Sequence, residues 1–355
     1  ETSKPELMRF EPLPKLAQSG WQFLTRLATV KPHTPKATIG LDIGSSSVKA
    51  VALGPRAASG TPPLLGHHQV VLEETSDAAI RSGIQQTVSA LAAPLKTVNL
   101  SVSGQSVIMR IVDMPKLAPK ELVQALPFEA QRYLPFNVQD VVLDGVVVGS
   151  TDGQKVQVLI VACRRDLLER RLAWIKDSDL EPGVVDVDAL AMVNAWADHG
   201  NESQRQGTQA MANVGSQWTN LAIVKEGQPF LVRDIPWGSN KLVKQMAEQL
   251  GCQESAVASQ MVQGSAAPAP EFVEAMRAGC EALVADLQLS FDFFENQFGM
   301  SPNAVALSGG MARCAGFLEA LGQHLAQPLT AWEPREGLAT HMAVAYGLAL
   351  RAAAV

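Results

Sequence analysis

The sequence predicts an α/β protein with two related halves and a small α+β subdomain inserted in the first half. Three strands and a helix are expected in the same order in each half, at residues 38–43, 47–53, 64–72 and 78–93, and again at 211–214, 219–224, 229–235 and 240–249. A further strand at 97–102 extends the first unit. The length of 355 residues also favours two lobes, because it exceeds the usual size of one hydrophobic core.

A short glycine turn follows the first strand of each half. One turn reads Asp42-Ile-Gly-Ser-Ser-Ser47, and the other reads Asn213-Val-Gly-Ser216. Glycine lets backbone N–H groups approach an anion closely, and hydroxyl groups add donors without bulk. A third turn, Ser308-Gly-Gly-Met311, precedes a predicted helix, where free N–H groups also favour an anion. Facing one another, the turns could clamp a nucleotide, with Asp42 at its strand end placed to hold Mg²⁺.

Composition and motif content argue against several other classes of protein. The net charge of -6 and the pI near 5.6 give no reason to expect nucleic acid as a partner. The sequence contains neither a P-loop signature nor a dinucleotide-binding fingerprint after a strand. It also has no apolar run of the ~18 residues that cross a bilayer and no signal peptide, so a cytoplasmic protein is expected. Wide spacing predicts reduced core thiols at Cys163, Cys252, Cys280 and Cys314.

Domain boundaries follow from the order of these elements. Lobe 1 is expected at 38–207, and lobe 2 at 208–355 with a mainly helical small subdomain at about 238–300. The helical part includes one long helix with a buried apolar stripe. Residues 115–182 are expected to form an α-β-β-α insertion in lobe 1, with antiparallel strands at 141–148 and 156–162.

Residues 1–37 form an N-terminal extension of different character. Prolines bracket a short amphipathic stretch in which Leu16, Phe23, Leu24 and Leu27 share one helical face. Two interpretations stay open: this helix docks on the protein's own globular body, or it attaches to a partner or a membrane surface. A partner is favoured over a membrane, because few basic residues accompany the apolar face.

Taken together, these segments resemble the actin, Hsp70 and sugar-kinase superfamily of bilobal ATP-binding proteins, whose duplicated fold is ribonuclease H-like. Within that superfamily the chain resembles the PilM family, the actin-like cytoplasmic components of type IV pilus assembly. The resemblance is carried by segments in family order, among them Gly40–Val51, Leu126–Phe136, Val184–Leu190, Arg233–Gly238, Leu307–Gly310 and Gly347–Arg351.

The resemblance implies that ATP or ADP binds with Mg²⁺ between the lobes. The implied metal ligands are Asp42 and Asp188, although Asp186 and Asp188 equally fit the role of capping a helix at 189–198. The implied nucleotide contacts come from the three turns, their flanking strands and the long helix: Gly44, Ser45, Ser46, Ser47, Lys49, Asn213, Gly215, Ser216, Thr219, Ser290, Gly309, Gly310 and Met311.

The resemblance also implies protein partners. PilM proteins bind the N-terminal cytoplasmic peptide of PilN, an inner-membrane protein, in a groove beside the inserted subdomain, which is shared in outline with the division protein FtsA. Other implied partners are inner-membrane pilus assembly proteins and cytoplasmic pilus motor ATPases, with peripheral membrane association through them and self-association as a further option. By position, the candidates for forming or supporting the groove are Leu126, Phe128, Tyr133 and Phe136, which equally suit the core of the subdomain.

One departure from the family bears on activity. The second turn usually begins with Asp in the family, whereas this chain has Asn213, which removes a negative charge near the metal. We therefore expect an ATP-binding assembly protein with at most slow ATPase activity rather than an enzyme. Two alternatives stay open, namely an FtsA-like protein that polymerises on membranes and a phosphotransferase of the sugar-kinase type.

Overall fold

The computed structural model describes residues 37–55, 60–91, 95–150, 153–199, 207–263 and 269–351. The amphipathic helix predicted in the N-terminal extension lies outside the described residues. No helix in these described ranges combines the length and the apolarity needed to span a membrane. Three of the predicted core thiols, Cys163, Cys280 and Cys314, are buried and free, but Cys252 is exposed, so that prediction was wrong for one cysteine.

The first large sheet contains five strands in the order β3-β2-β1-β4-β8. Its central strand is buried along its whole length, and so are most residues of the two strands beside it, because helices cover both faces of the sheet. A tight turn joins the first two strands and pairs Asp42 with Lys49 across the ladder. The strands are β1 Thr38–Ile43, β2 Ser47–Leu53, β3 Leu64–Val71, β4 Thr97–Val102 and β8 Glu181–Val187.

The second large sheet repeats this topology, in the order β11-β10-β9-β12-β13. In both sheets an antiparallel meander of three strands is extended on the far side of its first strand by two parallel strands. This equivalence confirms the duplication predicted from the order of strands and helices. The strands are β9 Thr208–Val214, β10 Thr219–Lys225, β11 Gln228–Ile235, β12 Ala304–Gly309 and β13 Leu329–Ala331.

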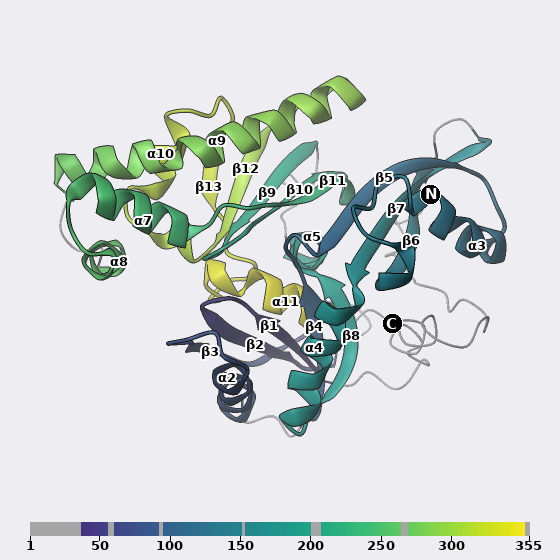
Figure 1. The fold of residues 1–355 in the computed structure, drawn as a ribbon, viewed down its shortest axis with the longest axis horizontal. Helices are drawn as coiled ribbons and strands as arrows, with labels where there is room; N and C mark the ends of the chain where they lie inside the picture. Colours follow the sequence, from purple (N-terminus) through teal and green to yellow (C-terminus); the bar gives the residue numbers. More distant parts are fainter. Residues whose placement is uncertain are drawn as a thin grey trace.

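Two helices, α5 Asp188–His199 and α11 Ala343–Leu350, lie between the two large sheets (Figure 1). They cross so closely that a Cβ added at Gly347 would lie 1.7 Å from the carbonyl oxygen of Ala191. On its other side, α11 approaches β1, where a Cβ added at Gly40 would lie 2.0 Å from the carbonyl oxygen of Ala345. Glycine is therefore required at both positions by contact with backbone atoms, which cannot move aside as a flexible side chain could.

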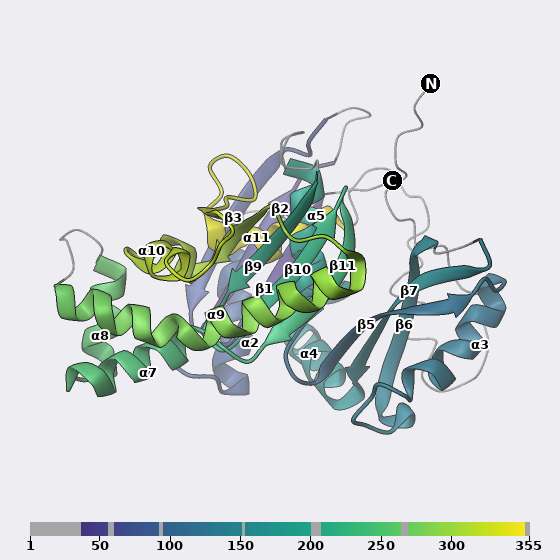
Figure 2. The ribbon, with the colours of Figure 1, turned by 90° about the horizontal axis from the view of Figure 1, so that it is seen from above.

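The outer faces of the two sheets carry the remaining helices of the lobes. Helices α2 Asp77–Ser89 and α4 Arg165–Asp177 cover the first sheet, and a larger helical group covers the second (Figures 1 and 2). The long helix α9 buries the apolar stripe predicted from its three- and four-residue spacing. The helical group consists of α7 Ser239–Leu250, α8 Glu254–Gln263, α9 Pro270–Phe298 and α10 Phe317–Gly322.

A third sheet, with the order β5-β7-β6, stands beside the first lobe (Figure 2). Its strands β6 Val141–Ser150 and β7 Lys155–Arg164 form the predicted antiparallel hairpin, and α3 Pro119–Ala130 covers one face. The strand β5 Val107–Pro115 is not predicted from the sequence, and it pairs with β7 along its whole length. The α-β-β-α description of 115–182 was therefore incomplete, because a third strand precedes α3. The short helix η1 Val138–Asp140 leads into β6.

The glycine pair after β12 does not open a regular α-helix as predicted. It leads into a short 3₁₀ segment, η2 Gly310–Arg313, and α10 begins only at Phe317. Gly309 has a positive φ of 89°, and a Cβ added there would lie 2.3 Å from the carbonyl oxygen of Val214. A close backbone approach of Gly309 to β9 therefore stands where the start of a helix was predicted.

The crossing of α5 and α11 makes a stability prediction. We expect Gly347→Ala to lower the free energy of unfolding by about 3 kcal/mol or more, because the added methyl group overlaps backbone atoms of α5. Gly322→Ala is the matched control, since a Cβ there makes only an ordinary 3.5 Å contact with Leu329. Chemical denaturation of both variants provides the measurement. Equal stability of the two variants would contradict the close crossing.

Candidate functional site

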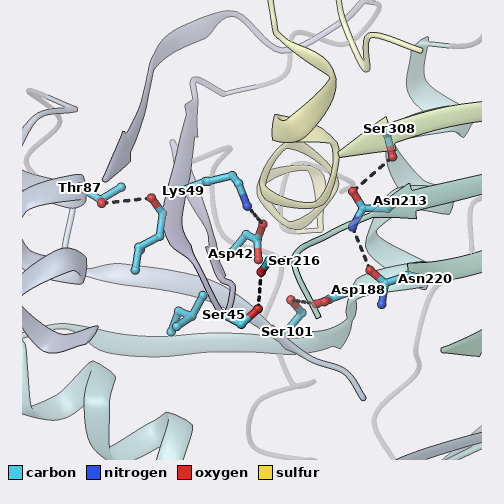
Figure 3. A network of polar contacts seen from close by, with 12 residues as sticks. Asp42, Ser45, Lys49, Thr87, Ser101, Asp188, Asn213, Ser216, Asn220 and Ser308 are labelled. Atoms are coloured by element: carbon cyan, nitrogen blue, oxygen red, sulfur yellow. Dashed lines mark hydrogen bonds and ion pairs between the residues drawn. The ribbon is translucent and has the colours of Figure 1, made fainter. Parts of the chain in front are cut away.

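The two glycine turns predicted from the sequence meet between the large sheets. The hydroxyl oxygens of Ser45 and Ser216 are 2.6 Å apart, within hydrogen-bond distance (Figure 3). Each turn is closed by an equivalent backbone hydrogen bond. In the first turn the Gly44 N–H donates to the Ser47 carbonyl at 3.0 Å, and in the second the Gly215 N–H donates to the Trp218 carbonyl at 2.9 Å. Equivalent turns of the two repeats therefore face each other, and we refer to the polar region where they meet as the cleft.

Two carboxylates of the first lobe border this cleft. Asp42, at the end of β1, accepts a hydrogen bond from Lys49 Nζ at 2.9 Å as part of an ion pair. Asp188, at the start of α5, accepts a hydrogen bond from the Ser101 hydroxyl at 2.5 Å (Figure 3). Burial and then the negative charge of Asp42 raise the pKa of Asp188 to about 6. A divalent cation would relieve this repulsion, so the pair fits the charge and chemistry of Mg²⁺.

The number of available side chains limits the predicted metal site. In the part of the chain that the structure describes, no three His, Cys, Asp or Glu side chains gather where they could hold a metal ion. A metal at Asp42 and Asp188 would therefore take its other ligands from water or from a bound phosphate, as Mg²⁺ commonly does.

Asn213, the residue that replaces the expected carboxylate of the second turn, is held by two neighbours. Its Oδ1 accepts a hydrogen bond from the Ser308 hydroxyl at 3.4 Å, and its Nδ2 donates to Asn220 Oδ1 at 2.9 Å (Figure 3). Ser308 is the next-to-last residue of β12 and directly precedes the glycine pair, so these contacts join the second turn to the third. The amide is oriented by protein contacts and supplies no negative charge.

The third turn offers backbone rather than side-chain contacts. A Cβ added at Gly310 would have no atom within 4 Å, so this residue faces open space. The Gly309 carbonyl accepts a hydrogen bond from the Thr340 hydroxyl at 2.9 Å, which anchors the turn to the segment before α11. Met311 is buried beneath the turn. The exposed Gly310 backbone is thus the part of this turn that can meet a flat ligand.

Two hydroxyls predicted to contact a nucleotide are engaged elsewhere. Thr219 is fully buried and donates to the Trp237 carbonyl at 2.8 Å. Ser290 is also buried; its hydroxyl donates to the Asp286 carbonyl at 2.6 Å and accepts from an Arg233 Nη at 3.0 Å. Because their protons are committed within the protein, these side chains do not supply free donors to a nucleotide. Ser46, in contrast, is exposed at the tip of the first turn, while Ser47 is buried at the start of β2.

Several residues near the cleft are not among the predicted site residues. Arg171 on α4 donates to the Ile43 carbonyl at 3.0 Å and so fixes the end of β1. His341 lies beside the first turn, where burial and the positive charges of Lys49 and Arg313 lower its pKa to about 4. These residues belong to elements distant in sequence from the turns, so no local pattern could assign them to the site.

A cavity separate from the cleft lies between the inserted sheet and the first lobe. It is a narrow cavity of about 80 Å³ lined mainly by aliphatic side chains, with the charged residues Asp144, Asp186 and Arg351. Arg351 Nε lies 2.9 Å from Asp186 Oδ2, while burial raises the pKa of Asp144. We call this cavity the insert groove; its lining comes from β4, β6, β7, β8, α4 and α5.

The residues proposed for the partner site lie away from the insert groove. Alternation along β6 directs Val142, Asp144 and Val146 to the groove, whereas Val141 and Leu143 face α3. The predicted partner residues belong to the α3 side. Leu126 is 1% exposed within that core, and Phe136 packs against it, while Phe128 and Tyr133 are exposed. Helix α3 thus stabilises the sheet from the face opposite the groove.

Comparison with known proteins supports the fold and assigns the family. The family model described as type IV pilus assembly protein PilM matches residues 40–353. The chain belongs to this family. A chain in a solved "PilM-PilN type IV pilus biogenesis complex" is similar to this one, with a TM-score of 0.76 and 24% sequence identity. That likeness covers 89% of this chain and 98% of the solved chain.

More distant structures share the architecture. The ethanolamine utilization protein EutJ from Carboxydothermus hydrogenoformans matches with a TM-score of 0.54 and 13% identity, over 90% of this chain and 92% of EutJ. MreB5 of Spiroplasma citri, solved bound to ADP, matches with a TM-score of 0.50 and 11% identity, over 89% and 95% of the respective chains. The predicted actin-like α/β fold of this PilM-family member is therefore confirmed.

The environment of His341 predicts a pH dependence. Its pKa is lowered from the ordinary value of 6.5 to about 4 in the folded protein. As the pH falls from about 6.5 towards 4, the unfolded chain binds a proton at this position before the folded protein does, so the free energy of unfolding decreases. We expect His341→Gln to lose this part of the acid sensitivity.

Denaturant unfolding at several pH values between 4 and 7 tests this expectation. His68→Gln, at an exposed position on β3, serves as the control and should follow the unmodified protein. Parallel curves for His341→Gln and the unmodified protein would refute the assignment.

Proposed function

We propose that this PilM-family protein is a cytoplasmic scaffold of type IV pilus assembly. It binds ATP or ADP with Mg²⁺ in the cleft and an N-terminal peptide of a PilN-like inner-membrane protein in the insert groove. It would act at the inner face of the inner membrane, with peripheral attachment through its partners, and connect assembly proteins there to the pilus motor ATPases. The observation that carries the proposal is the pair of equivalent turns meeting at Ser45 and Ser216 in a chain of this family.

The residues of the cleft suit a nucleotide in defined roles. Backbone N–H groups and hydroxyls of Ser45, Ser46 and Ser216 would hold the phosphates, and Lys49 would add a positive charge. The Gly309–Gly310 backbone would lie beside the adenosine. A phosphate between the turns would replace the direct contact of the two serines, because each hydroxyl then needs its own oxygen at ~2.7 Å.

The metal would be held by Asp42, with Asp188 contributing directly or through water. Mg²⁺ neutralises phosphate charge when it is bound, and Asp188 would then be ionised more readily than its raised pKa allows in the metal-free protein. Lys49 already neutralises Asp42 in part, which weakens the electrostatic attraction for the metal.

The same geometry supports at most slow hydrolysis. Asn213 supplies an oriented amide where a second carboxylate would strengthen metal binding, and its donor and acceptor are both engaged. The nucleotide would therefore act mainly as a ligand that stabilises one arrangement of the lobes. Neither a polymerising FtsA-like role nor a sugar-kinase activity gains a specific supporting contact in the described residues.

A nucleotide titration tests the cleft. ATP with Mg²⁺ should raise the free energy of unfolding by about 2.7 kcal/mol at a ligand concentration of ~100 times Kd. Asp42→Asn should remove most of the Mg²⁺ dependence, while Asp292→Asn, an exposed position on α9, should not. Thermal-shift and calorimetric titrations give both values. The binding claim fails if ATP causes no stabilisation, and the scaffold claim fails if steady turnover exceeds roughly one per second.

The insert groove suits a peptide better than a small molecule. Its volume of about 80 Å³ is far below the ~300 Å³ of the smallest ordinary ligand pockets, so it can take an anchoring side chain rather than a whole ligand. The strands β8 and β6 lie at sheet edges in the described structure, and both contribute lining residues. An extended peptide could thus place apolar anchors in the groove and direct polar groups towards Asp144 and Asp186.

Adjacent residues of β6 provide a matched pair of variants for this binding site. Val146 lines the insert groove, and Val147 is exposed on the opposite face of the strand. We expect Val146→Glu to weaken binding of a PilN-like N-terminal peptide at least tenfold, because it buries a charge at the anchor position. Val147→Glu should change the Kd less than twofold. Fluorescence anisotropy with a labelled peptide measures both, and equal effects of the two variants would place the peptide elsewhere.

A further inference from the structure

A chain of polar contacts leads from the nucleotide cleft to the first lobe. Asn213 Nδ2 donates to Asn220 Oδ1 at 2.9 Å, and Asn220 Nδ2 donates to Asp234 Oδ1 at 2.7 Å. The second oxygen of Asp234 accepts the backbone N–H of Gly104 at 2.6 Å. The first three residues belong to the second sheet, whereas Gly104 belongs to the loop between β4 and β5. The chain therefore crosses from one lobe to the other.

The Gly104 loop is held from the second lobe at another point as well. A Cβ added at Gly104 would lie 3.1 Å from the indole ring of Trp218, and the residue has a positive φ of 90°. Trp218 lies two residues after Ser216 in the second glycine turn, and its carbonyl accepts the Gly215 N–H. Two groups of the second lobe, the Trp218 ring and the Asp234 carboxylate, therefore lie next to Gly104.

The residues just before Gly104 face both proposed binding sites. The hydroxyls of Ser101 and Ser103 donate hydrogen bonds to Asp188, which borders the nucleotide cleft. Val102 lies between them and points the opposite way, into the insert groove. Beyond the loop, the chain continues directly into β5, the first strand of the inserted sheet. One short segment thus contacts the cleft, the groove and the insertion.

We propose that Asp234 is a positioning residue that couples nucleotide binding in the cleft to peptide binding in the insert groove, through its hydrogen bond to Gly104. This inference rests on the proposed function, because it assumes that both ligands bind. Nucleotide at the second turn fixes Asn213 and Asn220, and Asp234 transmits that position to Gly104 and Val102. ATP therefore tightens peptide binding, and by linkage the peptide tightens ATP binding by the same factor.

The donors and acceptors along the chain allow a specific test. In Asp234→Asn, the new amide must accept from both Asn220 Nδ2 and Gly104 N–H, but it has only one oxygen, so one contact is lost. Adding the second substitution, Asn220→Asp, restores the lost hydrogen bond. The new carboxylate accepts from Asn213 and from the amide at 234, whose oxygen accepts the Gly104 N–H. The double variant also keeps the net charge of the original pair.

The experiment is a titration of the full chain with a PilN-like N-terminal peptide, with and without saturating ATP and Mg²⁺. We expect ATP to lower the peptide Kd about tenfold in the unmodified protein, within the usual range of coupling between two sites. The factor should fall below twofold in Asp234→Asn and return towards tenfold in the double variant. Asp292→Asn, which removes an exposed carboxylate from α9, should keep the full factor. The ratio of the two Kd values reports coupling even if either affinity changes alone.

The outcomes separate this inference from the proposed function. Absence of peptide or ATP binding overturns the proposed function itself. Binding of both ligands with no effect of ATP on the peptide Kd overturns the coupling alone. Full coupling in a folded Asp234→Asn protein would show that Asp234 does not couple the two binding sites.

A second measurement keeps the inference testable if the single variant does not fold. Hydrogen exchange of the Gly104 amide in the unmodified protein reports directly on its hydrogen bond to Asp234. Binding of ATP with Mg²⁺ should slow this exchange at least fivefold, while an amide on the exposed strand β3 should be unaffected. Unchanged exchange at Gly104 in the ATP-bound protein would overturn the coupling.

Discussion

The contact between α5 and α11 is the constraint on which the arrangement of both lobes depends. Each large sheet needs an apolar layer on its inner face, and these two helices provide it for both sheets at once. The layer can be this thin because Gly347 lets the helices meet at backbone distance and Gly40 lets α11 rest directly on β1. A thicker layer would separate the glycine turns, whose serines now lie within hydrogen-bond distance. The packing of small residues in the interior therefore sets the width of the polar cleft.

Polar contacts complete this central layer. Asn99 donates to the carbonyl of Leu348, and Thr38 donates to that of Ala349, so carbonyl groups at the end of α11 find partners in the first sheet. Tyr346 donates from α11 to Asp198 on α5 at 2.7 Å. These buried bonds fix the rotation of the helices as well as their separation, because a misaligned helix would leave the polar groups without partners.

Local pattern was sufficient to predict the repeated units but not the contacts between them. The alternation and turn residues of β1, β2, β9 and β10 are encoded within short segments, so both glycine turns were recognisable. The β5 strand was missed although Ile108, Ile111 and Val112 are β-branched residues typical of strands, and its pairing with β7 is a contact that local pattern does not report. Thr219 and Ser290 have suitable chemistry for a nucleotide, but their hydroxyls donate to the carbonyls of Trp237 and Asp286. Asp234 and His341 likewise gain their roles from elements far away in the sequence, which periodicity and spacing cannot report.

The position of α11 in the chain has a consequence for the synthesis of the protein. The first sheet is complete when β8 has been made, yet α11, one of the two helices that cover its inner face, begins only at Ala343. At ~5–20 residues per second, a ribosome takes roughly eight to thirty seconds to reach that point from the end of β8. During this interval only α5 is available to cover the apolar inner face of the first sheet. The nascent chain therefore leaves the part of this apolar face that packs against α11 uncovered, and the first lobe is complete only once α11 has been made.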